Sequence, residues 1–121
     1  MTELNKVKEA IRELFLLTRE GDGFTGDDWS IDYNLDLDSE LFKELNSLHV
    51  EIELLTNAVK EKDFVTIKCA LIMARLHALN LSNLFLNLFE DIEKIGWSEE
   101  YKLPNIPDDY QIPEIYNYPK K

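Results

Sequence analysis

The sequence has few of the residues that cross-link or interrupt a chain. Its 121 residues include one cysteine, Cys69, and four glycines. A single cysteine excludes an internal disulfide and fits a reducing compartment, so a cytoplasmic location is expected. All four prolines lie after Leu103, and the N-terminus lacks the uninterrupted apolar segment of a signal peptide. With 45% hydrophobic residues and few glycines, the chain as a whole is typical of a folded helical protein.

Basic residues are scarce in one part of the chain. Between Glu20 and Glu53 there are eleven acidic residues and one basic residue, Lys43, which gives a charge of −10. The other 13 acidic and 12 basic residues give −1, so this region carries nearly all of the net charge of −11. Binding to nucleic-acid phosphates requires a basic face, and direct binding is therefore not expected. A basic protein is the partner that the charge favours.

Long uninterrupted apolar runs are also missing. The segment Cys69–Phe89 is very apolar, but it contains Arg75, His77 and four Asn or Ser residues. A membrane span tolerates few such groups. The segment is therefore predicted to be a core helix surrounded by protein, with Cys69 buried, and no membrane partner is expected.

Three segments have the apolar spacing of helices. They are predicted at 2–20, from Asp38 or Ser39 as N-cap to about 60–62, and at 63–95 with Asp63 as N-cap. A continuous helix over 63–95 would be about 50 Å long, which is long for so small a domain. A break or kink near 80–83 is therefore expected, and a break would start a fourth helix from Asn83 to Ile95 with Ser82 as its cap.

The second helix has an apolar stripe with alternating steps of four and three residues. Its members are Leu41, Leu45, Leu48, Ile52, Leu55 and Val59. This spacing predicts a surface that packs on other helices.

These elements predict an all-α fold, a small antiparallel bundle of three or four helices. The bundle domain is expected over 1–96 and includes a long acidic loop at 21–38. The tail, 97–121, contains the prolines and many apolar residues, which predicts an extended path over the bundle or over a partner.

No motif for catalysis stands out, and no cofactor or metal is expected. The alternation of acids from Asp32 onward suggests a calcium loop, but the loop would need glycine and glutamate where Leu37 and Lys43 stand. A metal-dependent all-α hydrolase is the enzymatic alternative. It would use Glu44, Glu51, Glu53 and His49.

The function expected is that of a non-enzymatic acidic binding protein. It would inhibit a basic partner such as a nuclease toxin or a nucleic-acid-binding enzyme, in the manner of an immunity protein or a phage inhibitor. The predicted contact residues are Asp27, Asp28, Trp29, Asp32, Tyr33, Asp36, Asp38 and Glu40. A helical structural protein that forms homo-oligomers through the apolar segment 67–89 is a further alternative.

Overall fold

The computed structural model describes residues 3–18, 26–97 and 103–119. It contains three α-helices, α1 (Asn5–Thr18), α2 (Leu37–Lys60) and α3 (Phe64–Trp97). Two short 3₁₀ turns lie at Gly26–Asp28 and Glu114–Tyr116. No strand occurs in these ranges, so the prediction of an all-α protein is confirmed for them.

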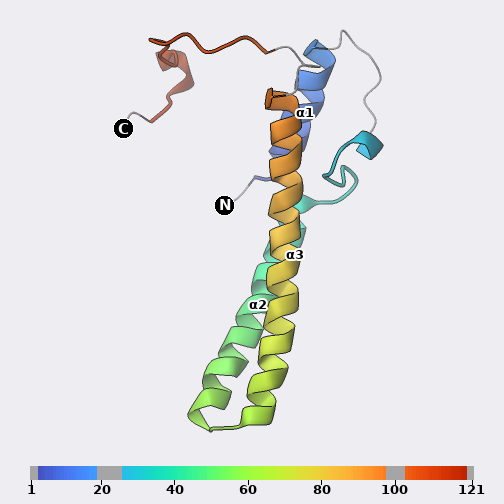
Figure 1. Ribbon diagram of the computed structural model, residues 1–121, viewed down its shortest axis with the longest axis vertical. Helices are drawn as coiled ribbons and strands as arrows, with labels where there is room; N and C mark the ends of the chain where they lie inside the picture. Colours follow the sequence, from blue (N-terminus) through green and yellow to red (C-terminus); the bar gives the residue numbers. More distant parts are fainter. Residues whose placement is uncertain (1–2, 19–25, 98–102, 120–121) are drawn as a thin grey trace.

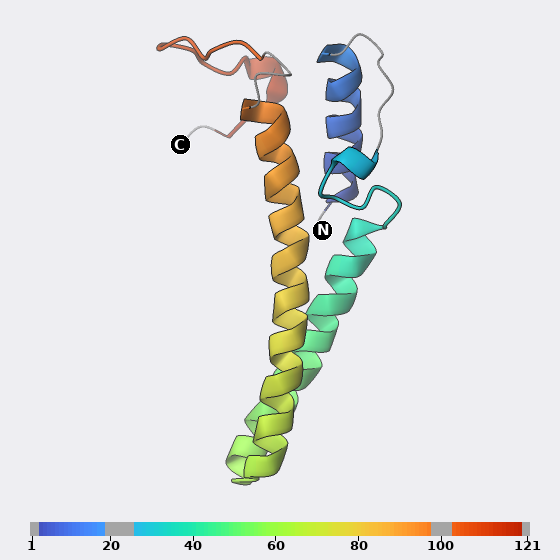
Figure 2. The same ribbon diagram turned by 45° about the vertical axis from the view of Figure 1, so that its right-hand side comes forward.

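Both other helices pack against the long helix α3. α2 and α3 form an antiparallel hairpin, and α1 continues the line of α2 along the C-terminal part of α3 (Figures 1 and 2). The N-termini of α1 and α2 meet midway along α3. The fold is therefore a rod that is two helices thick. α3 runs along one side, and α1 and α2 lie end to end along the other with their chains running in opposite directions.

Local capping sets where α2 and α3 begin. Asp36, and not Asp38 or Ser39 as predicted, is the N-cap of α2, because its side chain accepts a hydrogen bond from the Ser39 N–H at 3.1 Å. Asp63 caps α3 by accepting from the N–H of Thr66 at 3.1 Å, as predicted. Lys62, with φ of 56°, reverses the chain between them.

The predicted break in the third helix is wrong. α3 runs without interruption for 34 residues, about 51 Å, so the residues predicted to form a fourth helix are part of α3. The segment between Phe64 and Ile95 contains neither proline nor glycine, so the backbone has no reason to leave the helix. Asn80 uses its side chain to bond Glu44 of α2 at 3.2 Å, and it does not compete for the local backbone.

The core is small and lies at the α1 end of the rod. Its buried residues are Ile11, Phe15, Trp29, Ile31, Leu37, Leu88 and Ile95. They come from α1, from the loop before α2, from the first residue of α2 and from the C-terminal part of α3. In the hairpin itself burial is slight, and Cys69 is exposed, which corrects the prediction that it is buried. The reason is that α2 is the only helix beside this part of α3 in the described chain.

The described part of the tail, 103–119, is exposed at every residue. It extends away from the helices beyond the end of α3 (Figures 1 and 2). The prediction that the tail packs on a partner remains a prediction.

Candidate functional site

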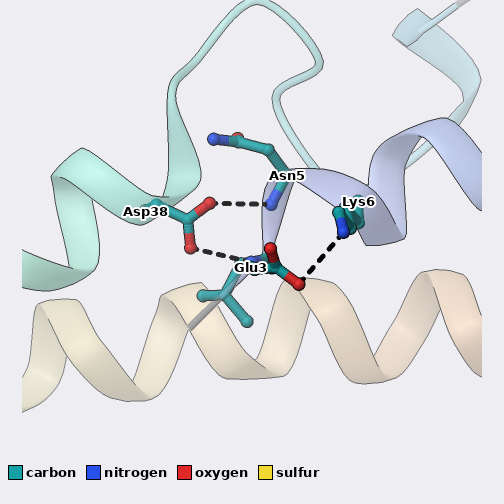
Figure 3. Close-up of polar contacts among 5 residues, drawn as sticks. Glu3, Asn5, Lys6 and Asp38 are labelled. Carbon is teal, nitrogen blue, oxygen red and sulfur yellow. Dashed lines mark hydrogen bonds and ion pairs between the residues drawn. The ribbon is translucent and has the colours of Figure 1, made fainter. Parts of the chain in front are cut away.

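The N-termini of α1 and α2 meet, and acidic side chains lie between them. Asp38 Oδ1 accepts a hydrogen bond from the Leu4 N–H at 2.7 Å, and its Oδ2 accepts from the Asn5 N–H at 3.2 Å (Figure 3). Asp36 caps α2. Because each helix N-terminus has a partial positive charge, the two carboxylates stabilise a junction at which two such ends meet.

Asn5 connects the same two helices in the opposite direction. Its Oδ1 accepts from the Leu37 N–H at 2.8 Å, and its Nδ2 donates to Asp36 Oδ1 at 2.8 Å. The hydrogen bonds from Asn5 and Ser39 hold the pKa of Asp36 below its ordinary value. Asp36 and Asp38, predicted to contact a partner, are thus brought together at a structural junction.

A buried acid of α3 holds the loop before α2. Asp91 is 1% exposed and accepts hydrogen bonds from the backbone N–H groups of Ser30, at 2.7 Å, and Ile31, at 2.8 Å. Asp91 is not among the site residues predicted from the sequence. Its signal was its spacing, because Leu88, Asp91 and Ile95 follow the three-and-four steps of a core row.

Trp29 is part of the core. It is 8% exposed and packs edge-to-face on Phe15, with ring centroids 6.3 Å apart. Lys94 Nζ lies 4.4 Å from the centroid of the indole ring and donates to the Asp28 carbonyl at 2.7 Å. The partner contact predicted for Trp29 would need an exposed ring, whereas the structure places the ring in the interior.

The other predicted contact residues are divided between surface and interior. Asp28 and Asp32 are exposed, and Tyr33 and Glu40 are half-buried. The side chain of Asp27 lies outside the described residues.

A pocket of about 620 Å³ lies beside Tyr33, between α1 and the loop. Arg12 lies over the tyrosine ring, 5.8 Å from its centroid. Burial, helped by the charge of Asp91, raises the pKa of the Tyr33 hydroxyl, and Arg12 opposes the shift. The hydroxyl therefore stays protonated near neutral pH and can act there as a hydrogen-bonding group, not as a base.

The α2–α3 hairpin is joined by one row of buried and half-buried side chains on each helix, which we call the seam. On α2 the seam is Leu37, Leu41, Glu44, Leu48, Glu51, Leu55 and Ala58. On α3 the facing residues are Ile67, Ala70, Ala74, His77, Leu81 and Leu84. Glu44 Oε2 and His77 Nδ1 lie 2.8 Å apart, which shows that the two rows face each other.

The seam takes up only half of the apolar stripe of α2. The stripe residues within it are Leu41, Leu48 and Leu55. The stripe residues outside it are Leu45, Ile52 and Val59, which are 47%, 46% and 54% exposed. Packing of the stripe on another helix is thus confirmed for its first group, and no helix of the described chain covers its second group.

α3 presents a matching row on the same side of the hairpin. In an antiparallel helix pair, equivalent positions next to the seam of each helix lie on one common side. The positions used here directly follow Glu44, Glu51 and Ala58 on α2, and Ala70, His77 and Leu84 on α3. On α2 these positions hold Leu45, Ile52 and Val59, and on α3 they hold Leu71, Ala78 and Phe85. All six are exposed. We call these six residues the open face.

The border of the open face contains no acidic residue. The positions next to it, which we call the rim, hold Phe42, His49, Thr56, Lys68, Arg75 and Ser82. The opposite side of the hairpin has a different character, because it contains polar residues. They include Glu40, Ser47, Asn80 and Asn87. The same side also holds exposed apolar residues, namely Val50, Leu54, Met73 and Leu76. The open face is therefore continuously apolar, whereas the opposite side of the hairpin is mixed.

The outer side of α3 is also apolar. Ile72, Leu79 and Leu86 lie there and are about half exposed. The prediction that protein surrounds this helix is therefore wrong for the chain by itself. In length and composition α3 could cross a membrane, a criterion that core helices of soluble proteins also meet.

The residues of the hydrolase alternative do not form one site. His49 and Glu53 are exposed and lie 3.2 Å apart, whereas Glu44 and Glu51 are in the seam. Among the described residues, no group of three or more His, Cys, Asp or Glu side chains is placed to hold a metal ion.

Comparison of the chain with models of known protein families, with curated proteins and with solved structures gave no match. The surfaces of the α2–α3 hairpin and of the loop before α2 are therefore the features that bear on function.

Proposed function

We propose that this protein is a non-enzymatic interaction module whose working surface is the open face of the α2–α3 hairpin. The observation that supports it is the position of Leu45, Ile52 and Val59. These residues have the spacing of a packed stripe, yet about half of each is exposed. A second helical element that covers them would complete a bundle of more than two helices.

The area of the open face supports the proposal. Six side chains exposed by about half present about 500 Å² of apolar surface, which is near the upper end for the largest patch of a monomer. At about 25 cal/mol per Å², covering it would stabilise a complex by on the order of 10 kcal/mol before the cost of association. Patches of this size that adjoin polar residues commonly bind proteins.

Paired variants test this function, because α2 has two apolar β-branched residues on different sides. Ile52 belongs to the open face, and Val50, 58% exposed, lies on another side of α2. Wild type, Ile52→Asp and Val50→Asp are used as baits in a lysate, and each captured protein is then purified and titrated by calorimetry. We expect a partner that binds wild type and Val50→Asp but binds Ile52→Asp at least tenfold more weakly. Equal binding to all three baits would contradict the proposal.

The concentration of acidic residues supports a second candidate, which is neutralisation of a basic protein such as a nuclease toxin. Asp28 and Asp32 are exposed on the loop, while Asp36 and Asp38 are engaged at the helix junction. Salt separates the two functions, because charge-based binding weakens with ionic strength and apolar binding does not. A partner bound through Asp28 and Asp32 should be released at about 0.5 M salt, and its binding should fall in Asp28→Asn/Asp32→Asn.

A further inference from the structure

We infer that the occupant of the open face is the same face of a second copy of this chain, so that two hairpins form a four-helix bundle. The inference rests on the proposed function, because it names the partner of that surface. Two hairpins are suited to each other in length and pattern. Each presents one apolar row on α2 and one on α3.

The distribution of charge favours a second copy over another partner. The chain has a net charge of −11, so a copy brings the same excess of acids. Acidic residues opposite one another would oppose the contact. The open face and the rim contain none, although α2 has acids on its other sides, including Glu40, Glu44, Glu51 and Glu53. A surface for a basic partner would have the reverse distribution.

The charges of the rim also favour one relative orientation of the two copies. Its basic residues, Lys68 and Arg75, are both on α3, and they would repel each other if α3 lay beside α3 of the copy. A twofold axis parallel to the helices instead places α3 beside α2 of the copy, with both hairpin turns at the same end. Counted from the Glu44–His77 contact, Glu53 lies level with Lys68 and within one to two turns of Arg75. Glu53 is exposed and lies next to the rim, so Glu53 of one copy can pair with these bases of the other.

The available area is sufficient for such a dimer. The open face provides about 500 Å² per copy, and the rim raises the buried area toward the roughly 800 Å² per partner of a standard interface.

Sedimentation equilibrium of the full chain between 1 and 100 µM tests the inference. We expect wild type to have twice the monomer mass in the upper part of this range. Ile52→Asp places a charge in the centre of the contact in each copy, and it should raise the dimer dissociation constant roughly a hundredfold or more. Val50→Asp adds the same charge on another side of α2 and should leave the constant within about threefold. Circular dichroism checks that both variants remain helical.

Charge exchange tests the arrangement. Glu53→Lys should weaken the dimer, as should the pair Lys68→Glu/Arg75→Glu, and the triple variant should recover toward wild type. If the triple variant is as weak as the sum of its parts, the parallel twofold axis is wrong.

Three outcomes would overturn the second-copy inference. A wild-type monomer at 100 µM that binds vesicles of phosphatidylcholine and phosphatidylglycerol through the open face would make a membrane the occupant. A monomer whose Ile52→Asp variant loses a different captured protein would leave the proposed function intact and remove only the second copy. A monomer whose partners bind Ile52→Asp as they bind wild type would remove both.

Discussion

The buried carboxylate of Asp91 gives a prediction that the structure allows to be worked out in detail. Its oxygens accept two backbone N–H groups from the loop before α2. In Asp91→Ala both donors lose their partner. The Ile31 N–H is buried, so its loss costs about 1–3 kcal/mol, whereas the Ser30 N–H is partly accessible to water and costs about 0.5–1.5 kcal/mol. The expected destabilisation is about 2–4 kcal/mol, a large part of the roughly 5–15 kcal/mol of a typical domain.

Urea unfolding followed by tryptophan fluorescence measures this loss. Trp29 lies in the core that Asp91 helps to form, but Trp97 is 78% exposed and would dilute its signal. The measurement is therefore made with Trp97→Phe as the reference. In this background, Asp91→Asn should lose about half as much as Asp91→Ala, because the amide keeps one acceptor oxygen. Hydrogen exchange of the Ile31 amide should become faster in both variants.

A matched control comes from the same helix. Glu93 is acidic and exposed, and Glu93→Ala should change the free energy of unfolding by less than about 0.5 kcal/mol. If Asp91→Ala is no less stable than Glu93→Ala, or if the Ile31 amide exchanges as slowly as in the reference, the assignment of Asp91 as the anchor of the loop is refuted.

Three further predictions concern the helix junction and the tail. Asp38→Ala removes the acceptor at the N-terminus of α1 and should cost about 1–2 kcal/mol by urea unfolding, with loss of helix signal; an unchanged midpoint would contradict the capping role. The pKa of Asp36 is lowered in the folded state, so its carboxylate contributes stability above the unfolded pKa of about 3.9, and that contribution is lost as pH falls through the folded pKa. The stability difference between wild type and Asp36→Asn should therefore shrink as the pH falls below the unfolded pKa of about 3.9, and a constant difference would argue against it. Deletion of residues 103–121 should leave the unfolding midpoint of the helices unchanged, because residues 103–119 are all exposed; a fall of more than about 0.5 kcal/mol would show a contact with the helices.

The helices themselves follow from local sequence, whereas the uninterrupted length of α3 depends on the rest of the chain. Asp63 caps α3 as its position before an apolar segment predicts, because a cap involves only the next three residues. The break expected at 80–83 rested on the size of a compact domain. The rod makes room for a 34-residue helix, since α1 and α2 share its length.

The roles of individual acidic side chains also could not be predicted from local sequence. Their concentration before α2 is evident from the sequence, but their roles are not. Asp38 caps α1, which is more than thirty residues away in the chain, and Asp91 holds a loop sixty residues away. Contacts between residues so far apart in the chain leave no recognisable pattern in the local sequence. The acids predicted to face a partner therefore include Asp36 and Asp38, whose carboxylates accept hydrogen bonds from other parts of the same chain.

Three properties follow from the amino-acid sequence alone: the all-α class, the spacing of the apolar stripe on α2 and the acidic character of the region before it. These properties depend on helix periodicity and on composition, which act within a few residues. Which half of the stripe is covered depends on how α2 packs against α3. With Glu44 directed towards His77 of α3, the orientation of α2 about its axis is such that Leu48 faces α3 and Ile52 faces outward. An apolar stripe wider than one helix contact predicts that more than one neighbour is needed, and the fold determines which side is left for the second.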